Sequence, residues 1–499
     1  MTPGLIPRWI LVRLVSPTHF NTLKIAPLKE LPLMLENNSK EVAEFMIAWL
    51  DKLNQQLVGG YMKQLIIGLA MGVVAAYLYL GNQTTEEIIE IETSSPDVVP
   101  ATSFAAVPGQ VGGQDFFGAY DVVPGWPINI ADQIEGHEDW TWGAGQSVFP
   151  ESPDRVFVLV RGEIPNVERP SNVSLRDIGI PANFPISGSV PWRNATNTSL
   201  PVGVDDTTDN CPPVSARGEC GVDVRWEHTI LVFNREGELI EDWTQWDYLL
   251  RRPHFITISP FDPEKHIWIV DDYRHAIFKF TNDGSELVQT IGIPNEYGDN
   301  NDQARFNRPT FMAFRSDGGF YVTDGYRNTR VVRFDAGGNY MMQWGEPGTG
   351  QYDDTRPGYM NNIHGLAIDH VTNEVYINDR DNNRVQAFTE DGEYLRDWGF
   401  GGRPSNIHLF YMGQDRMLWA FDQGTQKMLK YDREGNFLYS FGSFGVSPGG
   451  FFGVHGIAVD QEGSLYVAEV GNGGAQKYTP KEGANPELLL GTPTYSAWE

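Results

Sequence analysis

One pattern of strand, acidic turn, strand, glycine-containing turn and strand occurs four times between residues 266 and 442. Alternating β-branched and aromatic residues predict the strands, and turns such as NDG and EDG suit tight hairpins that need positive φ. The aligned acids are 53, 55 and 43 residues apart, a spacing typical of propeller blades. These acids are Asp271, Asp324, Asp379 and Asp422.

Two further units bring the predicted number of blades to six. The last unit is GSLYVAEVGNGGAQKY, with Glu469 in the place of the acid. The first is split: DRVFVLVRGEIP supplies inner strands, HTILVFNREGELIEDW supplies outer ones, and residues 166–227 are inserted between them. We therefore predict an all-β, six-bladed β-propeller, in which Tyr120–Pro127 joins the last blade to the first. A pair of β-sandwiches would explain neither the period nor the repeated terminal WG or FG.

The segment before the repeats contains an uninterrupted apolar run of 16 residues, LIIGLAMGVVAAYLYL. It is shorter than the roughly 20 residues of a spanning helix, and no clean cleavage site follows it, so it is either a signal sequence or an uncleaved membrane anchor. We expect an N-terminal extension with a misassigned start or a short cytoplasmic segment (1–61), a signal or anchor (62–82), a linker (83–116), the propeller (117–485) and a C-terminal tail (486–499).

Acidic residues dominate the chain, which has a formal net charge of −28. The first 61 residues hold six Lys or Arg and five Asp or Glu, so the remainder carries the whole negative excess. Such a surface repels phosphate backbones, and we expect no nucleic-acid partner. The same charge suits an extracytoplasmic protein, anchored or exported, or one that binds divalent cations. We expect the propeller to be monomeric.

The only two cysteines, Cys211 and Cys220, lie within the insertion. In an exported protein they are expected to close one small disulfide loop. A two-cysteine metal site is the weaker alternative, because no histidine stands near them in the sequence.

Three histidines precede inner strands in alternate blades. They are His254 in RRPHFITIS, His364 in NNIHGLAID and His455 in FGVHGIAVD, whereas the intervening blades have Thr310 and Asn406 at or near that position. Alternate blades of a six-fold ring lie about 120° apart, so equivalent side chains converge on the axis. Three histidines with an open fourth position form a typical catalytic metal site.

Each of these histidines also has an ordinary structural interpretation, namely packing or bonding to a neighbouring loop. Their threefold placement favours the metal site over this alternative. Three neutral imidazoles suit zinc, and iron or another transition metal is the remaining choice.

Charged and phenolic side chains are expected on the same rim. Arg161 in LVRGE, Tyr326 in TDGYRNTR and Arg380 in NDRDNNR follow inner strands in the turns between strands. Two guanidinium groups beside a metal would recognise a carboxylate through paired hydrogen bonds, and a nearby tyrosine can move a proton. Surface salt bridges and simple packing are the alternative roles of these residues.

The ordered set VRGE, PHF, DGYRNTR, IHGLAID, NDRDNNR and VHGIAVD resembles the peptidyl-α-hydroxyglycine α-amidating lyase family, and the repeats resemble NHL repeats. The resemblance covers about residues 117–480. It implies cleavage of a carbinolamide C–N bond to give an amide and glyoxylate. The resemblance implies that zinc is bound by His254, His364 and His455, and that the catalytic base is Tyr326. It also implies that the substrate carboxylate is bound by Arg161 and Arg380.

Two positions depart from the family pattern. Gly456 stands where the family has an aspartate that contributes to a calcium site, so calcium is not expected here. Arg327 replaces the family's cysteine beside the tyrosine, and its disulfide is therefore missing. The 499 residues also contain no segment that resembles the copper monooxygenase of the amidating machinery. The substrate could then be another carbinolamide or a hydroxy acid, and any partner enzyme would be separate.

Two other functions compete with the lyase. A membrane-anchored NHL propeller could act as a scaffold that binds a partner protein and catalyses nothing. A metal-dependent lactonase or esterase is another chemistry of six-bladed propellers, although such enzymes usually use carboxylate and asparagine ligands. The cluster of three histidines, two arginines and one tyrosine distinguishes the lyase from both alternatives.

Overall fold

The computed structural model describes residues 106–107, 114–166, 225–350, 354–402 and 404–498. All of them belong to one compact unit, Val99–Glu499. The apolar run of the predicted signal or anchor, the inserted segment 167–224 and both cysteines lie outside the described residues. No helix in the described ranges combines the length and the hydrophobicity needed to cross a bilayer.

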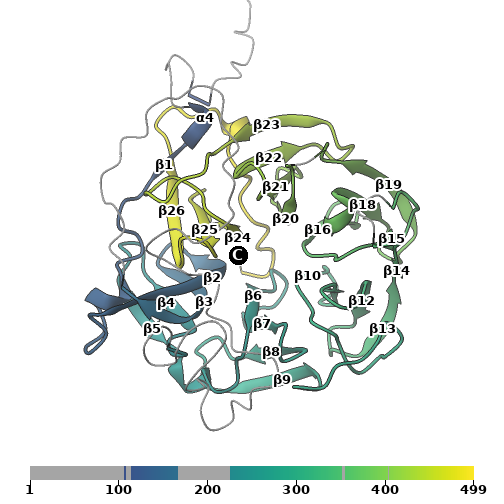
Figure 1. Cartoon of the computed structure of the whole chain (residues 1–499), viewed down its shortest axis with the longest axis horizontal. Helices are drawn as coiled ribbons and strands as arrows, with labels where there is room; N and C mark the ends of the chain where they lie inside the picture. The colour runs from purple at the N-terminus through teal and green to yellow at the C-terminus, as the bar shows by residue number, and fades with distance from the viewer. Residues whose placement is uncertain (1–105, 108–113, 167–224, 351–353, 403, 499) are drawn as a thin grey trace, which may run out of the picture. The chain divides into compact units, whose positions relative to one another are not determined.

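Six four-stranded sheets form the predicted six-bladed propeller, which is confirmed (Figure 1). Each sheet runs from an inner strand at the axis to an outer strand at the rim. Blades one to three contain β2 (Trp140–Ser152), β3 (Arg155–Pro165), β4 (Ile230–Phe233) and β5 (Leu239–Asp242); β6 (Pro253–Ile258), β7 (Ile267–Asp271), β8 (Ala276–Phe280) and β9 (Leu287–Gly292); and β10 (Met312–Phe314), β11 (Phe320–Asp324), β12 (Arg330–Phe334) and β13 (Tyr340–Trp344).

The remaining blades follow the same order. They contain β16 (Leu366–Asp369), β17 (Glu374–Asp379), β18 (Arg384–Phe388) and β19 (Tyr394–Gly399); β20 (Ile407–Met412), β21 (Leu418–Asp422), β22 (Lys427–Tyr431) and β23 (Phe437–Phe441); and β24 (Val454–Val459), β25 (Leu465–Glu469), β26 (Ala475–Pro480) and β1 (Tyr120–Val122). A short parallel pair, β14 (Glu346–Pro347) with β15 (Tyr359–Met360), and the helix α4 (Gln114–Phe117) are additions to this frame.

The ring is closed by a strand from the start of the propeller. β1 pairs with β26 in antiparallel register, with Tyr120 opposite Pro480 and Val122 opposite Tyr478. The last blade is thus built from both ends of the domain, as the sequence predicted. Closure of this kind leaves no open edge in the circular arrangement of blades.

The repeated terminal Trp-Gly is explained by the contact between neighbouring blades. The hairpin glycine of one blade packs on the tryptophan that ends the preceding blade. A Cβ added to Gly392, which has φ of +79°, would lie 2.7 Å from the indole of Trp344. The same pairing joins Gly284 to Trp243 and Gly435 to Trp398. Glycine is required here both by the positive φ and by the close approach of the indole.

Buried acids hold the loops that precede the inner strands. The carboxylate of Asp271 accepts the backbone N–H groups of Arg251 and Arg252, at 2.7 and 3.0 Å. The equivalent acid of four other blades accepts one backbone N–H two or three residues before the site position: Asp324 from Asn307, Asp379 from Asn361, Asp422 from Asn406 and Glu469 from Phe452. The repeated acid of the sequence therefore fixes where each inner strand begins.

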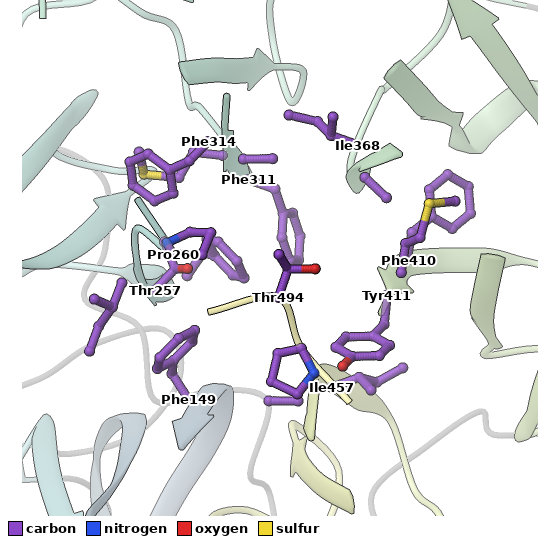
Figure 2. A pocket seen from close by; sticks show the side chains of 18 of the residues that line it. Phe149, Thr257, Pro260, Phe311, Phe314, Ile368, Phe410, Tyr411, Ile457 and Thr494 are labelled. Atoms are coloured by element: carbon purple, nitrogen blue, oxygen red, sulfur yellow. The ribbon is translucent and has the colours of Figure 1, made fainter. Parts of the chain in front are cut away.

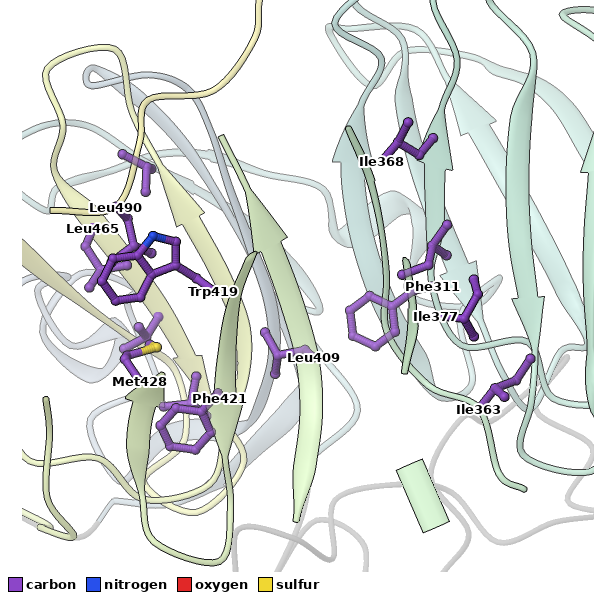
Figure 3. Close-up of a cluster of buried hydrophobic side chains, with 14 of the residues drawn as sticks. Phe311, Ile363, Ile368, Ile377, Leu409, Trp419, Phe421, Met428, Leu465 and Leu490 are labelled. Carbon is purple, nitrogen blue, oxygen red and sulfur yellow. The ribbon is translucent and has the colours of Figure 1, made fainter. Parts of the chain in front are cut away.

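Buried apolar side chains from both faces of each blade fill the space between blades. Figure 3 shows part of one cluster that extends over blades three to six, with Phe311 and Ile377 on one side and Leu409 and Trp419 on the other. All four are at most 4% exposed. The propeller thus has a core between every pair of blades and not a single central one.

The C-terminal residues cross the axis at the end of the inner strands that lies away from the histidines. The Tyr411 hydroxyl donates to the Gly491 carbonyl at 2.6 Å, and the Tyr495 hydroxyl donates to the Pro150 carbonyl at 3.2 Å. Between them, Thr494 lies in the middle of an apolar cavity of about 180 Å³ (Figure 2). The segment interpreted as a C-terminal tail therefore covers one mouth of the central tunnel.

Tyr120 connects ring closure to this C-terminal segment, and its substitution tests both. Its side chain is fully buried, and its hydroxyl accepts the Leu490 N–H at 2.8 Å. We expect Tyr120→Ala to lower the free energy of unfolding by about 3–5 kcal/mol. Tyr120→Phe should cost about 1–3 kcal/mol because it leaves the N–H without an acceptor.

Urea unfolding followed by circular dichroism measures both changes. Tyr297→Ala is the control, because Tyr297 is 70% exposed and its loss should change stability by no more than about 0.5 kcal/mol. A Tyr120→Ala protein as stable as this control would contradict the account of ring closure.

Candidate metal centre

A bulge in the inner strand directs one side chain of a blade into the axial site. In four blades the pairing register shifts around a single residue, which is Gln146, His254, His408 or His455. A β-bulge leaves its extra residue unpaired and re-aims its side chain. Thr310 and His364 hold the same place in the other two blades, just before β10 and β16.

This register corrects the alignment made from the sequence for blade five. His408, and not Asn406, occupies the bulge position, because Ile407 pairs with Asp422 and Leu409 with Phe421. The ring centroid of His408 lies 5.6 Å from that of His364. The site therefore contains a fourth imidazole that the sequence alignment missed.

The three predicted histidines converge. Their ring centroids are 4.6 Å apart for His254 and His455, 5.0 Å for His254 and His364, and 5.1 Å for His364 and His455. All three are buried, with exposures of 5% or less. One ligand atom from each lies within 4.8 Å of the others, a separation that a single metal ion can bridge.

Each imidazole is fixed by a carbonyl of the following blade. His254 Nδ1 lies 2.8 Å from the Thr310 carbonyl oxygen, and His455 Nδ1 lies 2.9 Å from that of Gln146. His364 Nδ1 is likewise 2.5 Å from the carbonyl oxygen of His408. A carbonyl only accepts, so each Nδ1 carries the proton and each Nε2 has a free lone pair. Outer hydrogen bonds of this kind orient metal-binding histidines.

The electrostatic surroundings keep these imidazoles neutral. Burial, followed by the nearby His455 and Arg161, lowers the pKa of His254 well below its usual value. Burial and Arg380 do the same to the pKa of His364. Burial is also the main cause that lowers the pKa of His455 to about 3. Neutral imidazole is the form that binds a metal.

Tyr326 brings a hydroxyl to the same point. Its Oη lies 3.0 Å from His254 Nε2 and 3.0 Å from His364 Nε2. The phenolic proton can be donated to only one of these nitrogens, and His455 adds a third lone pair. The cluster therefore has more lone pairs than protons at its centre, which is the donor set that a cation fits.

Guanidinium groups surround the Tyr326 ring. Arg380 and Arg308 place their Cζ atoms 5.5 and 4.6 Å from the ring centroid, and Arg252 lies at 5.8 Å. Arg161 is 4% exposed and donates weakly to the Pro253 carbonyl at 3.5 Å. Burial, and next the charge of Arg252, lower the pKa of Arg161 to about 9, so it remains a cation at neutral pH.

Arg252 and Arg308 are site residues that sequence reasoning missed. Both bind the buried carboxylate of Asp272, with Arg252 Nη1 at 3.3 Å and Arg308 Nη2 at 2.6 Å. Each stands two residues before a bulge-position residue, in RRPH and NRPT respectively. The shared Arg-Pro before these two inner strands is the signal that could have found them.

Gln146 is a second unexpected feature of the ring. It is fully buried, and neither atom of its side-chain amide has a hydrogen-bond partner in the described part of the chain. The structure thus brings together all six residues predicted from the sequence, and it adds Gln146, His408, Arg252 and Arg308 around them.

The lowered pKa values predict a loss of stability in acid for the metal-free protein. Unfolded histidine titrates near pH 6.5, above the folded values, so the unfolded state binds protons first as the pH falls. The stability is present above about pH 6.5 and decreases towards the folded pKa, which is about 3 for His455.

Burial of neutral His455 should therefore lower the free energy of unfolding by about 2 kcal/mol at pH 5 relative to pH 7.5. Chelator-treated His455→Gln protein should lose about 2 kcal/mol less over this range than wild type, measured by urea unfolding at each pH. Parallel pH profiles for the two proteins would show that His455 is not buried as a neutral base.

Comparison with known proteins gives relatives but no matching family model. NHL repeat-containing protein 3 of Mus musculus is 28% identical over 272 residues, 52% of this chain and 74% of that protein. Peptidyl-alpha-hydroxyglycine alpha-amidating lyase 1 of Drosophila melanogaster is 25% identical over 288 residues, 53% of this chain and 51% of its own length.

A third relative matches over a shorter segment but with a higher sequence identity. Peptidyl-glycine alpha-amidating monooxygenase of Mus musculus is 33% identical over 177 residues, which are 34% of this chain and 17% of that protein. The matched segments thus span about half or less of these two amidating proteins. The resemblance seen in the sequence is confirmed at this level: the chain is a six-bladed β-propeller whose homologues include NHL-repeat proteins and peptidyl-α-hydroxyglycine α-amidating lyases.

Proposed function

We propose that the axial site is the active site of a metal-dependent lyase that cleaves a carbinolamide C–N bond and releases an amide and glyoxylate. The observation that carries this proposal is the meeting of three neutral imidazoles with the Tyr326 hydroxyl, which lies 3.0 Å from two of their Nε2 atoms. A structural role alone requires no such excess of lone pairs at one buried point.

The residues that would hold the metal are His254, His364 and His455, through Nε2. Zinc is the proposed ion, because neutral imidazoles suit it and three protein ligands leave one position open. When bound, it would supply Lewis-acid chemistry to the hydroxyl of the substrate. The carbonyls that accept the Nδ1 protons would keep the ligands in place between turnovers.

The substrate carboxylate is assigned to Arg161 and Arg380. Arg161 lies within β3, opposite Ala144, whereas Arg380 directly follows β17. Both guanidinium groups help to lower the pKa of the His455 imidazole. Within the described residues, the ionic partner of Arg380 is a distant one, Asp381 at 3.6 Å, so its guanidinium would be available to a ligand. Paired N–H donors from arginine bind carboxylate with defined orientation.

Tyr326 is assigned as the group that moves the proton. As phenolate, its Oη takes the proton of the α-hydroxyl, the hydroxyl electrons form the carbonyl of glyoxylate, and the C–N electrons pass to the departing amide nitrogen. That nitrogen takes up one proton, so no water is consumed. The guanidinium groups of Arg252, Arg308 and Arg380 lie around the Tyr326 ring and would stabilise charge that develops during this transfer.

Access to the site fits this assignment. Tyr326 and Arg380 are partly exposed, so solvent and ligands reach their side of the ring. The opposite mouth of the tunnel is covered by the C-terminal segment around Thr494 (Figure 2). The substrate would therefore enter and the products would leave on the Tyr326 side.

The proposal predicts that Tyr326→Phe lowers kcat by about 10²–10⁴-fold, because only the proton-transfer group is lost. The measurement is glyoxylate release from an N-acyl-α-hydroxyglycine by zinc-loaded protein. Arg380→Gln should mainly raise KM, because it removes a carboxylate contact.

Tyr273→Phe is the matched control, because the Tyr273 ring packs on the guanidinium groups of Arg252 and Arg308 at the same 4.6 Å. It should retain most of the activity. A wild-type protein that contains zinc but releases no glyoxylate would instead favour a scaffold or a hydrolase, and ester or lactone substrates would then separate these two.

A further inference from the structure

A second cluster of potential metal ligands lies in blade one, outside the axial site. His137 precedes β2, Glu163 lies on β3, and Glu227 and His228 precede β4. One ligand atom from each can lie within 4.8 Å of all the others. His137, Glu163 and His228 are 8%, 0% and 7% exposed, whereas the Glu227 side chain is 48% exposed.

Short contacts connect the four side chains of this cluster. Glu163 Oε2 lies 2.9 Å from His137 Nδ1, Glu163 Oε1 lies 3.7 Å from His228 Nε2, and Glu227 Oε2 lies 3.9 Å from His137 Nε2. Tetrahedral zinc with bonds of about 2.0–2.2 Å needs ligand atoms about 3.3–3.6 Å apart. One ligand atom from each of the four residues already lies within 4.8 Å of the others, so small side-chain movements would bring one set of four atoms to this spacing.

One buried oxygen in the cluster lacks a partner. Among the described residues, nothing donates a hydrogen bond to Glu163 Oε1, although the side chain is completely buried. An unsatisfied buried carboxylate oxygen destabilises the fold unless a cation or a hydrogen-bond donor reaches it. Burial correspondingly raises the pKa of the Glu163 carboxyl, against the opposing effect of the two imidazoles.

Two carboxylates hold His228 in a ligand-like orientation. Asp242 Oδ2 lies 2.5 Å from His228 Nδ1 as an ion-pair contact, and His228 Nε2 faces Glu163. The backbone of His228 has φ of +59°, an uncommon value, and its N–H donates to Asp247 Oδ2 at 2.8 Å. A carboxylate behind an imidazole is the usual support of a metal-binding histidine.

We propose that His137, Glu163 and His228 form a second zinc site, which Glu227 or water completes. Imidazole nitrogen and carboxylate oxygen are both ordinary zinc ligands. Glu227 also contacts Arg225 Nη2 at 3.0 Å, so it can exchange between the arginine and the ion. Because it is exposed, it offers the ion a route from solvent.

The ion would connect three separate segments at one end of the first blade. Glu163 and His228 stand on either side of the long insertion, residues 166–227, and His137 belongs to the segment that leads into β2. Backbone hydrogen bonds between Glu163 and Arg225, at 2.7 and 2.9 Å, already join two of them. The site would therefore be structural, and it is independent of the lyase proposal.

The experiment is elemental analysis of zinc in the full chain after loading with zinc and removal of excess ion. We expect about two zinc ions per chain in wild type and about one in His364→Ala, where the axial site is lost. Glu163→Gln keeps the size of the side chain but removes its charge, and it should also leave about one. The double variant should contain almost none.

The control is His266→Ala, which removes an imidazole that stands beside two carboxylates, Asp262 and Glu264, on blade two. Its zinc content should equal that of wild type. Zinc in Glu163→Gln equal to wild type would overturn the second site, whereas unchanged zinc in His364→Ala would overturn the axial metal centre. The two failures are therefore distinguishable.

Cobalt binding provides a test whose main measurement is made with the second site intact. In His364→Ala protein, one equivalent of Co²⁺ should give the strong visible absorption of four-coordinate cobalt with nitrogen and oxygen ligands. His137→Ala and His228→Ala in that background should each abolish the band. Absence of the band from folded His364→Ala protein would overturn the proposal even if variants of Glu163 fail to fold.

Discussion

The site depends on the buried carboxylate at the end of the second strand in five of the six blades. Each acid accepts at least one backbone N–H from the loop that precedes the inner strand, and so sets the distance from that loop to the bulge. Burying such a carboxylate disfavours its charged form, and for Asp271 burial raises the pKa of the carboxyl to about 6. Four backbone N–H groups, of residues 251, 252, 273 and 274, offset that cost.

From this constraint the convergence of the histidines follows. The fixed loop and the bulge place one side chain per blade at the axis, and alternate blades supply His254, His364 and His455. The carbonyl of the next blade then takes each Nδ1 proton. Because the blades in between provide these carbonyls, all six blades contribute to the arrangement of these three histidines.

The charges around this cluster have a consistent arrangement. Neutral imidazoles lie at the centre, and arginines lie around Tyr326, where Asp272 offsets part of their charge. This distribution would favour an anionic ligand above the proposed metal. The strongly negative net charge of the chain would not prevent binding of the proposed carboxylate substrate, because the field at the site is local.

Much of the fold and of the axial site could be predicted from the sequence, because the same sequence pattern recurs in successive blades. The spacing of the acids and of the hairpin glycines predicted the six blades. The similar sequence motifs around His254, His364 and His455 predicted that these side chains converge on the axis. His408 was missed because Asn406 stands two residues before it, close to the expected position, and Asn406 is instead the residue whose backbone N–H bonds to Asp422. Arg252 and Arg308 act across blade boundaries, and His137 meets Glu163 and His228 only through the fold of blade one.

The most direct test of the central claim is a crystal structure of the zinc-loaded chain with anomalous diffraction measured on both sides of the zinc absorption edge. The account predicts an edge-dependent peak on the propeller axis, about 2.0–2.1 Å from Nε2 of His254, His364 and His455, with Tyr326 Oη beside it. An axis without such a peak, with each Nε2 bonded to water or to Tyr326, would contradict it.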